Sequence, residues 1–235
     1  MTDLFVELTR QPVFGVSLTL TAYQIGLLIQ KKTRSAVANP MLLATSLIIL
    51  FLTTAKIPYE TYNAGAKIVS FFLGPATVAL AVPLCKQIKI LARNWQAVLI
   101  GVITGSLTGV ATSLLIALLF KASPQVALSL VPKSVTTPIA MEVARTLGGI
   151  PPLTAGVVLI AGLIGALIGP EILSLFGVKN EVARGIAMGA ASHALGTTRA
   201  MQESELQGAM SGVAIALVGI TTALLAPYAA KLAGF

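Results

Sequence analysis

The sequence predicts an all-α polytopic membrane protein, on the strength of three observations. Of its 235 residues, 56% are apolar, only 10% are charged, and the mean hydropathy is +0.90. A soluble domain carries about 25% charged residues, so these charges are too few to cover a solvated surface. The apolar residues form separate runs near the roughly 20 residues that a membrane-spanning helix needs. We expect six to eight transmembrane segments in a lipid bilayer, in two repeat-related halves with broken or re-entrant helices.

The composition also excludes several function classes. A disordered chain is rich in charge, which this one is not. The net charge of +8 does not indicate nucleic-acid binding, because the 16 basic residues lie singly or in small groups between apolar runs. One histidine and one cysteine cannot build a metal cluster, and no Gly-Lys-Ser/Thr phosphate loop is present. We expect no metal, no cofactor and no enzymatic activity.

Six apolar runs are continuous enough to be expected as spans. Asn39 is a candidate N-cap for the second run, with Pro40 in its first turn. The polar stretch 57–64 is expected as an external turn with interfacial tyrosines. The runs, in order, are 12–30, 40–55, 68–84, 96–120, 153–168 and 206–225.

Two further segments, 121–149 and 185–201, are apolar but interrupted by prolines, glycines and ionisable residues. Each is expected either as a broken span or as a hairpin that enters and leaves the membrane on one face. Both alternatives give an even number of crossings. The two ends of the chain are therefore expected on the same side of the membrane.

Basic residues give the expected orientation. Positively charged residues mark cytoplasmic loops, and two groups two spans apart agree with each other. Both would be cytoplasmic, which places the N-terminus, the 57–64 turn and the C-terminus outside. The groups are Lys31, Lys32 and Arg34, and Lys86, Lys89 and Arg93.

An offset of 115 residues aligns the chain with itself. It pairs Gly74 with Gly189 and lays 96–120 over 211–235, with five identities in a 14-residue window. Chance is an alternative in so Ala- and Gly-rich a chain, but whole apolar runs also align. We therefore expect halves at 1–120 and 121–235. Interrupted segments at matching positions of two halves indicate a transporter binding site.

The physical basis of such a site is the broken helix, whose N-terminal end exposes unpaired N–H groups to an anion. The candidate breaks are at Gly74-Pro75 and within 189–196. Lys133 is followed by three hydroxyls between two prolines, and together they could envelop an oxyanion. The alternative is an interfacial loop whose lysine extends to water.

Other ionisable residues within apolar segments are functional candidates because they are costly there. Glu142 and Arg145 either neutralise each other across one helical turn or leave Glu142 for ion coupling. His193 is either a satisfied structural residue or a proton carrier. Arg199 either clamps a carboxylate or ends its helix at the interface. Ser192 and His193 are expected on different helix faces, which argues against a catalytic pair.

Glycines recur at intervals of four residues on three of the apolar runs, and such faces permit close helix contact. We interpret them as structural. The pairs and triplet are Gly101, Gly105 and Gly109; Gly165 and Gly169; and Gly208 and Gly212.

Three strings, in order along nearly the whole chain, resemble the LrgB/CidB family. They are Phe72-Leu73-Gly74-Pro75-Ala76-Thr77-Val78-Ala79-Leu80-Ala81-Val82-Pro83-Leu84, Pro132-Lys133-Ser134-Val135-Thr136-Thr137-Pro138-Ile139-Ala140, and Ala191-Ser192-His193-Ala194-Leu195-Gly196-Thr197 with Arg199-Ala200. The resemblance implies one LrgB-like transmembrane domain over 1–235 in a bacterial inner membrane.

The resemblance implies two alternative functions. One is a carrier or facilitator of small monocarboxylates such as glycolate, glycerate or pyruvate, as in the LrgB portion of the plastid glycolate/glycerate translocator. The other is a holin/antiholin-like modulator of murein hydrolase activity and autolysis, acting with a separate LrgA/CidA-type partner. Interrupted segments with buried charges favour the carrier, and we also expect a homo-oligomer. The coupling candidates are Glu142 and His193, and the expected carboxylate-binding residues are Gly74, Pro75, Thr77, Lys133, Ser134, Thr136, Thr137, Ser192, His193, Gly196, Thr197 and Arg199.

Overall fold

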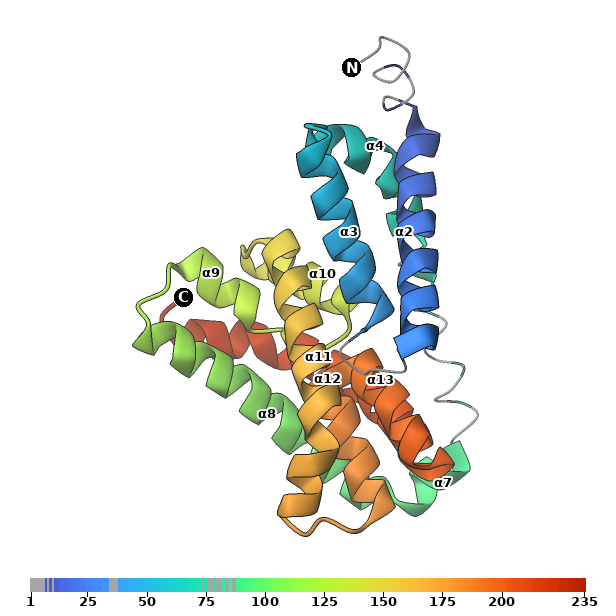
Figure 1. Ribbon diagram of the computed structural model, residues 1–235. Coiled ribbons are helices and arrows are strands. Elements are labelled where there is room, and N and C mark those ends of the chain that lie inside the picture. The colour runs from blue at the N-terminus through green and yellow to red at the C-terminus, as the bar shows by residue number, and fades with distance from the viewer. Residues whose placement is uncertain are drawn as a thin grey trace. The chain divides into compact units, whose positions relative to one another are not determined.

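The computed structural model describes residues 7, 9, 11–33, 38–72, 74, 75, 78, 82, 85 and 88–235. Every element in this part of the chain is an α-helix, as the composition predicts (Figure 1). Four of the described helices, α2, α8, α11 and α13, are long and apolar enough to cross a membrane, and α3 is a shorter apolar helix. The helices are α2 (Pro12–Thr33), α3 (Pro40–Thr54), α4 (Tyr59–Phe71), α7 (Ile88–Arg93), α8 (Trp95–Leu119), α9 (Pro124–Leu130), α10 (Thr137–Leu147), α11 (Pro151–Leu175), α12 (Glu181–Glu203) and α13 (Glu205–Leu232).

Five of the six predicted apolar runs coincide with a helix. The N-cap prediction is confirmed for α3, because the Asn39 Oδ1 accepts hydrogen bonds from the backbone N–H groups of Met41 at 2.9 Å and Leu42 at 3.4 Å. Pro40 occupies the first turn of the same helix, where its missing N–H costs no hydrogen bond.

The prediction of a turn at 57–64 is wrong, whereas its expected place outside the membrane stays a prediction. Helix α4 begins at Tyr59, directly after Pro58, and Glu60 in its first turn complements the positive end of the helix dipole. The Tyr62 hydroxyl lies 2.9 Å from the Thr19 Oγ1 on α2, so this half-buried tyrosine packs against α2. Only residues 68–71 of the predicted 68–84 run belong to α4, and most of the rest of that run lies outside the described residues.

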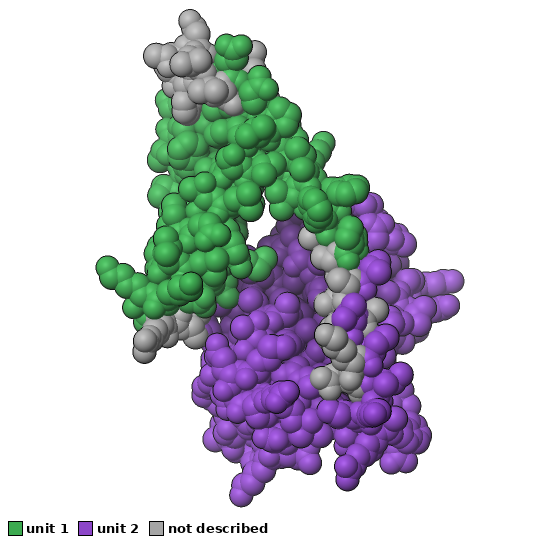
Figure 2. Space-filling view, turned by 90° about the vertical axis from the view of Figure 1, so that its right-hand side faces the viewer, with its two compact units in different colours: residues 1–76 green, residues 77–235 purple. Residues whose placement is uncertain are grey.

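The chain forms two compact units, residues 1–76 and 77–235, which are coloured separately in Figure 2. In unit 1, α2 packs against both α3 and α4. Glycine makes this approach possible: a Cβ added to Gly26 would lie 2.7 Å from the carbonyl oxygen of Pro40. The predicted halves, 1–120 and 121–235, stay a prediction, as does the number of spans.

Unit 2 is organised around α12, which packs against α8, α11 and α13. Glycines face α12 from two neighbouring helices. A Cβ added to Gly101 would lie 2.6 Å from Ile186 Cγ2, and one added to Gly169 would lie 2.7 Å from Met188 Sδ. The predicted close contacts also hold at Gly105, Gly109, Gly165 and Gly208, whereas Gly212 faces open space.

Residues 121–149 form a helical hairpin of α9 and α10 joined by residues 131–136. The hairpin begins where α8 ends. Leu147, at the end of α10, packs against the same apolar cluster as Ala229 and Ala233, so the hairpin returns to the end of the unit where α13 finishes. Its tip lies deeper: Ser134 contacts Gly109, and Ile139 contacts Gly219, near the middles of α8 and α13.

Helix α12 is broken at His193, inside the predicted 189–196 interval. His193 has φ 40° and ψ −132°, which is outside the helical region. A Cβ added to Gly196 would lie 2.5 Å from the carbonyl oxygen of Met188, although eight residues span roughly 12 Å in a straight helix. The second arm therefore folds back. Both arms meet the start of α13, where the Arg184 Nε donates to the Gln207 Oε1 at 3.4 Å.

Replacing Gly185 tests the close packing of α12 on α13. The Gly185→Ala substitution places a Cβ 2.5 Å from the carbonyl oxygen of Gln207 and 2.8 Å from the Met210 Cβ. We expect it to lower the free energy of unfolding by about 1–3 kcal/mol through overpacking, measured by denaturation in detergent. Gly156→Ala is the matched control, because nothing lies within 4 Å of the added atom. Equal stability of the two variants would contradict the packing.

Candidate functional site

A groove of about 690 Å³ lies between α8 and α12. One wall is the face of α8 from Ala97 to Thr112, and the other is the first arm of α12 from Ala183 to Ala191. Lys133 and Ser134 contribute from the tip of the α9–α10 hairpin. The groove is thus lined mainly by α8, which is a continuous helix, and by two interrupted segments, the α9–α10 hairpin and α12.

Lys133 supplies the charge of the groove. Its Nζ donates to the carbonyl oxygen of Gly109 at 3.3 Å, which occupies one of the three ammonium donors. Among the described residues, no carboxylate lines the groove or forms an ion pair with Lys133. The other two donors are therefore available to an anion, and the side chain is half-buried in largely apolar surroundings.

The hydroxyls near Lys133 are only partly satisfied. Ser134 lies against Gly109, where an added Cβ would come within 3.1 Å of its Oγ. The Oγ1 of Thr136 is buried and has no hydrogen-bond partner among the described residues, and Thr137 is half-buried in the first turn of α10. The structure therefore places Lys133 and Ser134 in the groove. Thr136 and Thr137 follow them in the sequence but do not line the groove.

The residues at the α12 break face a different neighbour. The His193 Nε2 lies 2.9 Å from the carbonyl oxygen of Val158, and its ring packs against Gly162 of α11. Ser192 packs against Gly165 of the same helix, and its buried Oγ has no partner in the described part of the chain. Both side chains thus contact α11, which corrects the expectation that they lie on different faces. The backbone reversal at His193 is the cause.

Thr197 and Gly196 stabilise the folded-back arm. The Thr197 Oγ1 donates to the carbonyl oxygen of His193 at 3.0 Å and lies 2.7 Å from the Oγ of Ser211 on α13. Gly196 provides the space for the approach to Met188. None of the residues 192–197 lines the groove, whereas Ala190 and Ala191, immediately before the break, do. Of the two predicted groups of binding residues, only the one on the hairpin therefore lines the groove, through Lys133 and Ser134.

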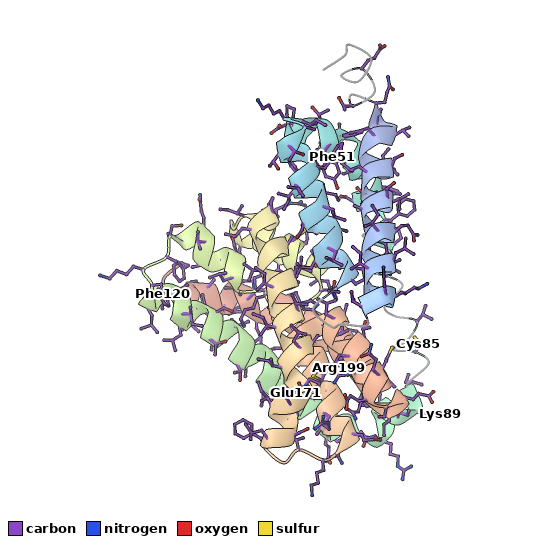
Figure 3. All side chains as sticks on the ribbon, in the orientation of Figure 1. Phe51, Cys85, Lys89, Phe120, Glu171 and Arg199 are labelled. Atoms are coloured by element: carbon purple, nitrogen blue, oxygen red, sulfur yellow. The ribbon has the colours of Figure 1, made fainter. Side chains whose placement is uncertain are left out.

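The charge of Arg199 is compensated by carboxylates. Its Nη2 lies 2.9 Å from the Glu203 Oε1 on its own arm and 3.9 Å from the Glu171 Oε1 on α11. Arg199 and Glu171 can be followed in Figure 3, where they lie next to each other. Glu142 and Arg145 also pair, at 2.7 Å, on an exposed face of α10. The ion pairs therefore favour mutual neutralisation at both places. They argue against Arg199 as a free carboxylate-binding cation and against Glu142 as an ion-coupling residue.

Three predicted residues remain, Gly74, Pro75 and Thr77. Gly74 and Pro75 belong to unit 1, and Thr77 lies outside the described residues. One set of groove residues escaped the sequence prediction: Thr104, Thr108 and Thr112, one helical turn apart on α8. Their spacing of four residues places them on one face of the helix, and this spacing was the signal in the sequence that could have predicted them. The glycines Gly101, Gly105 and Gly109 recur at the same interval on the same helix.

Removing the Thr197 hydroxyl tests how the second arm of α12 is held. Thr197→Val leaves the fully buried Ser211 Oγ without its partner at 2.7 Å. We expect the free energy of unfolding to fall by about 1–3 kcal/mol, measured by thermal denaturation in detergent. The adjacent Thr198→Val is the control, since Thr198 is exposed and bonds only within its own helix. Its expected change is within about 0.5 kcal/mol; an equal loss for both would argue against the Ser211 contact.

Comparisons with known proteins cover nearly the whole chain. The sequence model of the LrgB-like family matches residues 19–232. An uncharacterized protein of Haemophilus influenzae is 39% identical over 218 residues, which are 93% of this chain and 94% of that protein. Proteins of Bacillus mycoides and Bacillus cereus named antiholin-like protein LrgB are 36% identical over 220 residues, 93% of this chain and 96% of theirs.

No solved structure matches the chain. The family match extends over both compact units, and the matched region contains every helix of unit 2. Four long apolar helices are described within the chain. The chain belongs to the LrgB-like family and is a multi-pass membrane protein.

Proposed function

We propose that this protein is an antiholin-like membrane protein that modulates murein hydrolase activity and autolysis. The supporting observation is the similarity, at 36% over 93% of the chain, to proteins named antiholin-like protein LrgB. The comparisons favour this function over solute transport, because no relative among those described here is named for a substrate. In this proposal the protein acts with a small LrgA/CidA-type membrane protein as its partner.

Autolysis in a strain lacking the chromosomal gene tests the proposal. We expect detergent-triggered lysis to be several-fold faster than in the parent strain and to return to the parental rate when the wild-type gene is supplied. The Lys133→Gln variant should restore the parental rate as well, because an antiholin-like role does not require the free cation. Parental lysis rates in the deletion strain would contradict the proposal.

A second candidate function is favoured by one observation, the uncompensated Lys133 in the groove. We propose as this alternative a carrier or facilitator of small monocarboxylates, such as glycolate, glycerate or pyruvate. A carboxylate beside the ammonium would gain charge-assisted hydrogen bonds and relieve the cost of an unpaired charge in apolar surroundings. Ser134 lies next to the same position and could donate a further hydrogen bond.

Flux into proteoliposomes separates the two functions. If the carrier function holds, Lys133→Gln lowers the uptake of labelled glycolate or pyruvate at least about tenfold, the equivalent of one lost charge-assisted interaction. Lys121→Gln is the matched control, because Lys121 is exposed at the start of the hairpin segment. Uptake by the wild-type protein that equals empty liposomes, or that Lys133→Gln leaves unchanged, would exclude carboxylate transport through this groove. Leakage of an unselective dye would instead indicate a pore.

The placement in the membrane is also a proposal. We infer an inner-membrane location with six crossings, which are the described helices α2, α3, α8, α11 and α13 and the apolar run 68–84 that the sequence predicts as a span. The α9–α10 hairpin and the broken α12 then enter from opposite faces without crossing. Lys89, Arg93 and Lys179 lie at the same end of unit 2 and support its assignment to the cytoplasm. Both termini would then lie outside.

A further inference from the structure

We propose that the groove between α8 and α12 is a hydrated vestibule that opens at one face of the membrane only and delivers small anions to Lys133. The inference rests on the groove used by the second candidate function. It concerns access rather than transport, so it can hold or fail independently. Its site is the Lys133 ammonium, and its ligand class is a small hydrophilic anion.

The open end follows from the helix termini. The groove begins at Ala97 and Ala183, each in the first turn of its helix. The residues just outside these turns are polar, since Asn94 precedes α8 and Asn180 precedes α12. From Ala97 to Thr112 the α8 wall runs for roughly 22 Å. The groove therefore extends from one end of the unit past the middle of α8 and stops about two helical turns before the end of that helix.

The closed end is an apolar cluster. Beyond Thr112, the buried Leu114 of α8 packs with Val131, Val143 and Ala226 from the hairpin and α13. Val131 lies two residues before Lys133 in the same connection, and Val110 follows Gly109, whose carbonyl oxygen accepts the hydrogen bond from Lys133. A small hydrophilic anion gains no hydrogen bonds from such side chains and pays the cost of desolvation there. This cluster separates Lys133 from the face where α13 ends.

A stripe of three threonines on α8 favours hydration of the groove. Thr104, Thr108 and Thr112 line the groove at successive turns, and Lys133 sits where the stripe ends. Each hydroxyl has acceptor lone pairs for water, even where its proton bonds back to a helix carbonyl. The neighbouring Leu107 is also exposed but does not line the groove. A charged lysine in pure hydrocarbon would be costly, and a water-filled approach removes that cost.

Cysteine accessibility tests the sidedness. Single substitutions Thr108→Cys, Thr112→Cys and Lys133→Cys are made in a Cys85→Ser background, together with Ser123→Cys, which reports the opposite end. Reconstituted vesicles are treated from each face with membrane-impermeant methanethiosulfonates. We expect the three groove variants to be labelled from the face of Asn94 only, and Ser123→Cys from the other face only. Thr108→Cys labelled from both faces, or from neither, overturns the proposal.

Leu107→Cys is the matched control for hydration. It differs from Thr108→Cys by one residue on the same helix, and only a thiol in contact with water ionises to the reactive thiolate. We expect Thr108→Cys to react at least about tenfold faster. Equal rates would show that exposure on α8, rather than the groove, governs labelling. Retained elution volume on gel filtration verifies that each variant folds.

The charge of Lys133 is tested by comparing an anionic with a cationic reagent. Normalised to Ser123→Cys, the anionic reagent should modify Thr112→Cys about tenfold faster than the cationic reagent, because a nearby positive charge attracts it. Adding Lys133→Gln should abolish the preference. A preference that survives Lys133→Gln would assign the selectivity to another group and overturn the role of Lys133.

Discussion

The reversal of α12 at His193 is the constraint on which the rest of unit 2 depends. A residue with a side chain at φ 40° and ψ −132° costs on the order of 1–3 kcal/mol, and the surrounding contacts must offset that. The imidazole does so in part by reaching the carbonyl oxygen of Val158. A glycine at this position would adopt the backbone more easily but would lose this contact, so the side chain explains why histidine stands here.

The break in turn determines where small residues are needed. Two arms of one helix occupy the space of a single span, so the neighbouring helices must approach their backbones closely. Gly162 and Gly165 of α11 admit the His193 and Ser192 side chains, and Gly185 and Gly189 bring the first arm against α13. Small residues of this kind are the usual means of close helix packing in membranes. Nine of the 21 glycines in the sequence therefore lie in this one interrupted helix or against it.

Much of this architecture could be predicted from the sequence, because apolar runs, caps and interruptions are local signals. The bounds of α8, the start of α13, the Asn39 cap and a break within 189–196 are of that kind, whereas α13 continues through Pro227 to Leu232, beyond the predicted end at 225. Helix α4 was missed because its tyrosines and Glu60 look like an exposed turn. Only the contact with α2, through Tyr62 and Thr19, places one of them against another helix. A polar face hidden against another helix leaves no local signature.

For the candidate site, the sequence predicted which kinds of residue take part but not which of the cations would be left without a carboxylate partner among the described residues. Lys133 and Arg199 are both conspicuous as cations in apolar segments, and the one local difference is Glu203, four residues after Arg199 at the spacing of a helical ion pair. The folded chain separates the two cations, because it places Glu203 and Glu171 beside Arg199 and no described carboxylate beside Lys133. Glu171 lies 28 residues from Arg199, so that ion pair depends on how α11 packs against the second arm.

Arg199 has carboxylate partners and Lys133 has none among the described residues, and this difference bears on function. Arg199 is neutralised within the fold, so it can stabilise the arm without any solute. Lys133 has only the Gly109 carbonyl as a described partner, and a carbonyl dipole compensates a full charge incompletely. The remaining compensation has to come from water or from an anion that enters the groove. An antiholin-like role alone gives no physical reason for an uncompensated cation at the end of a threonine-lined groove, whereas access by a small anion does.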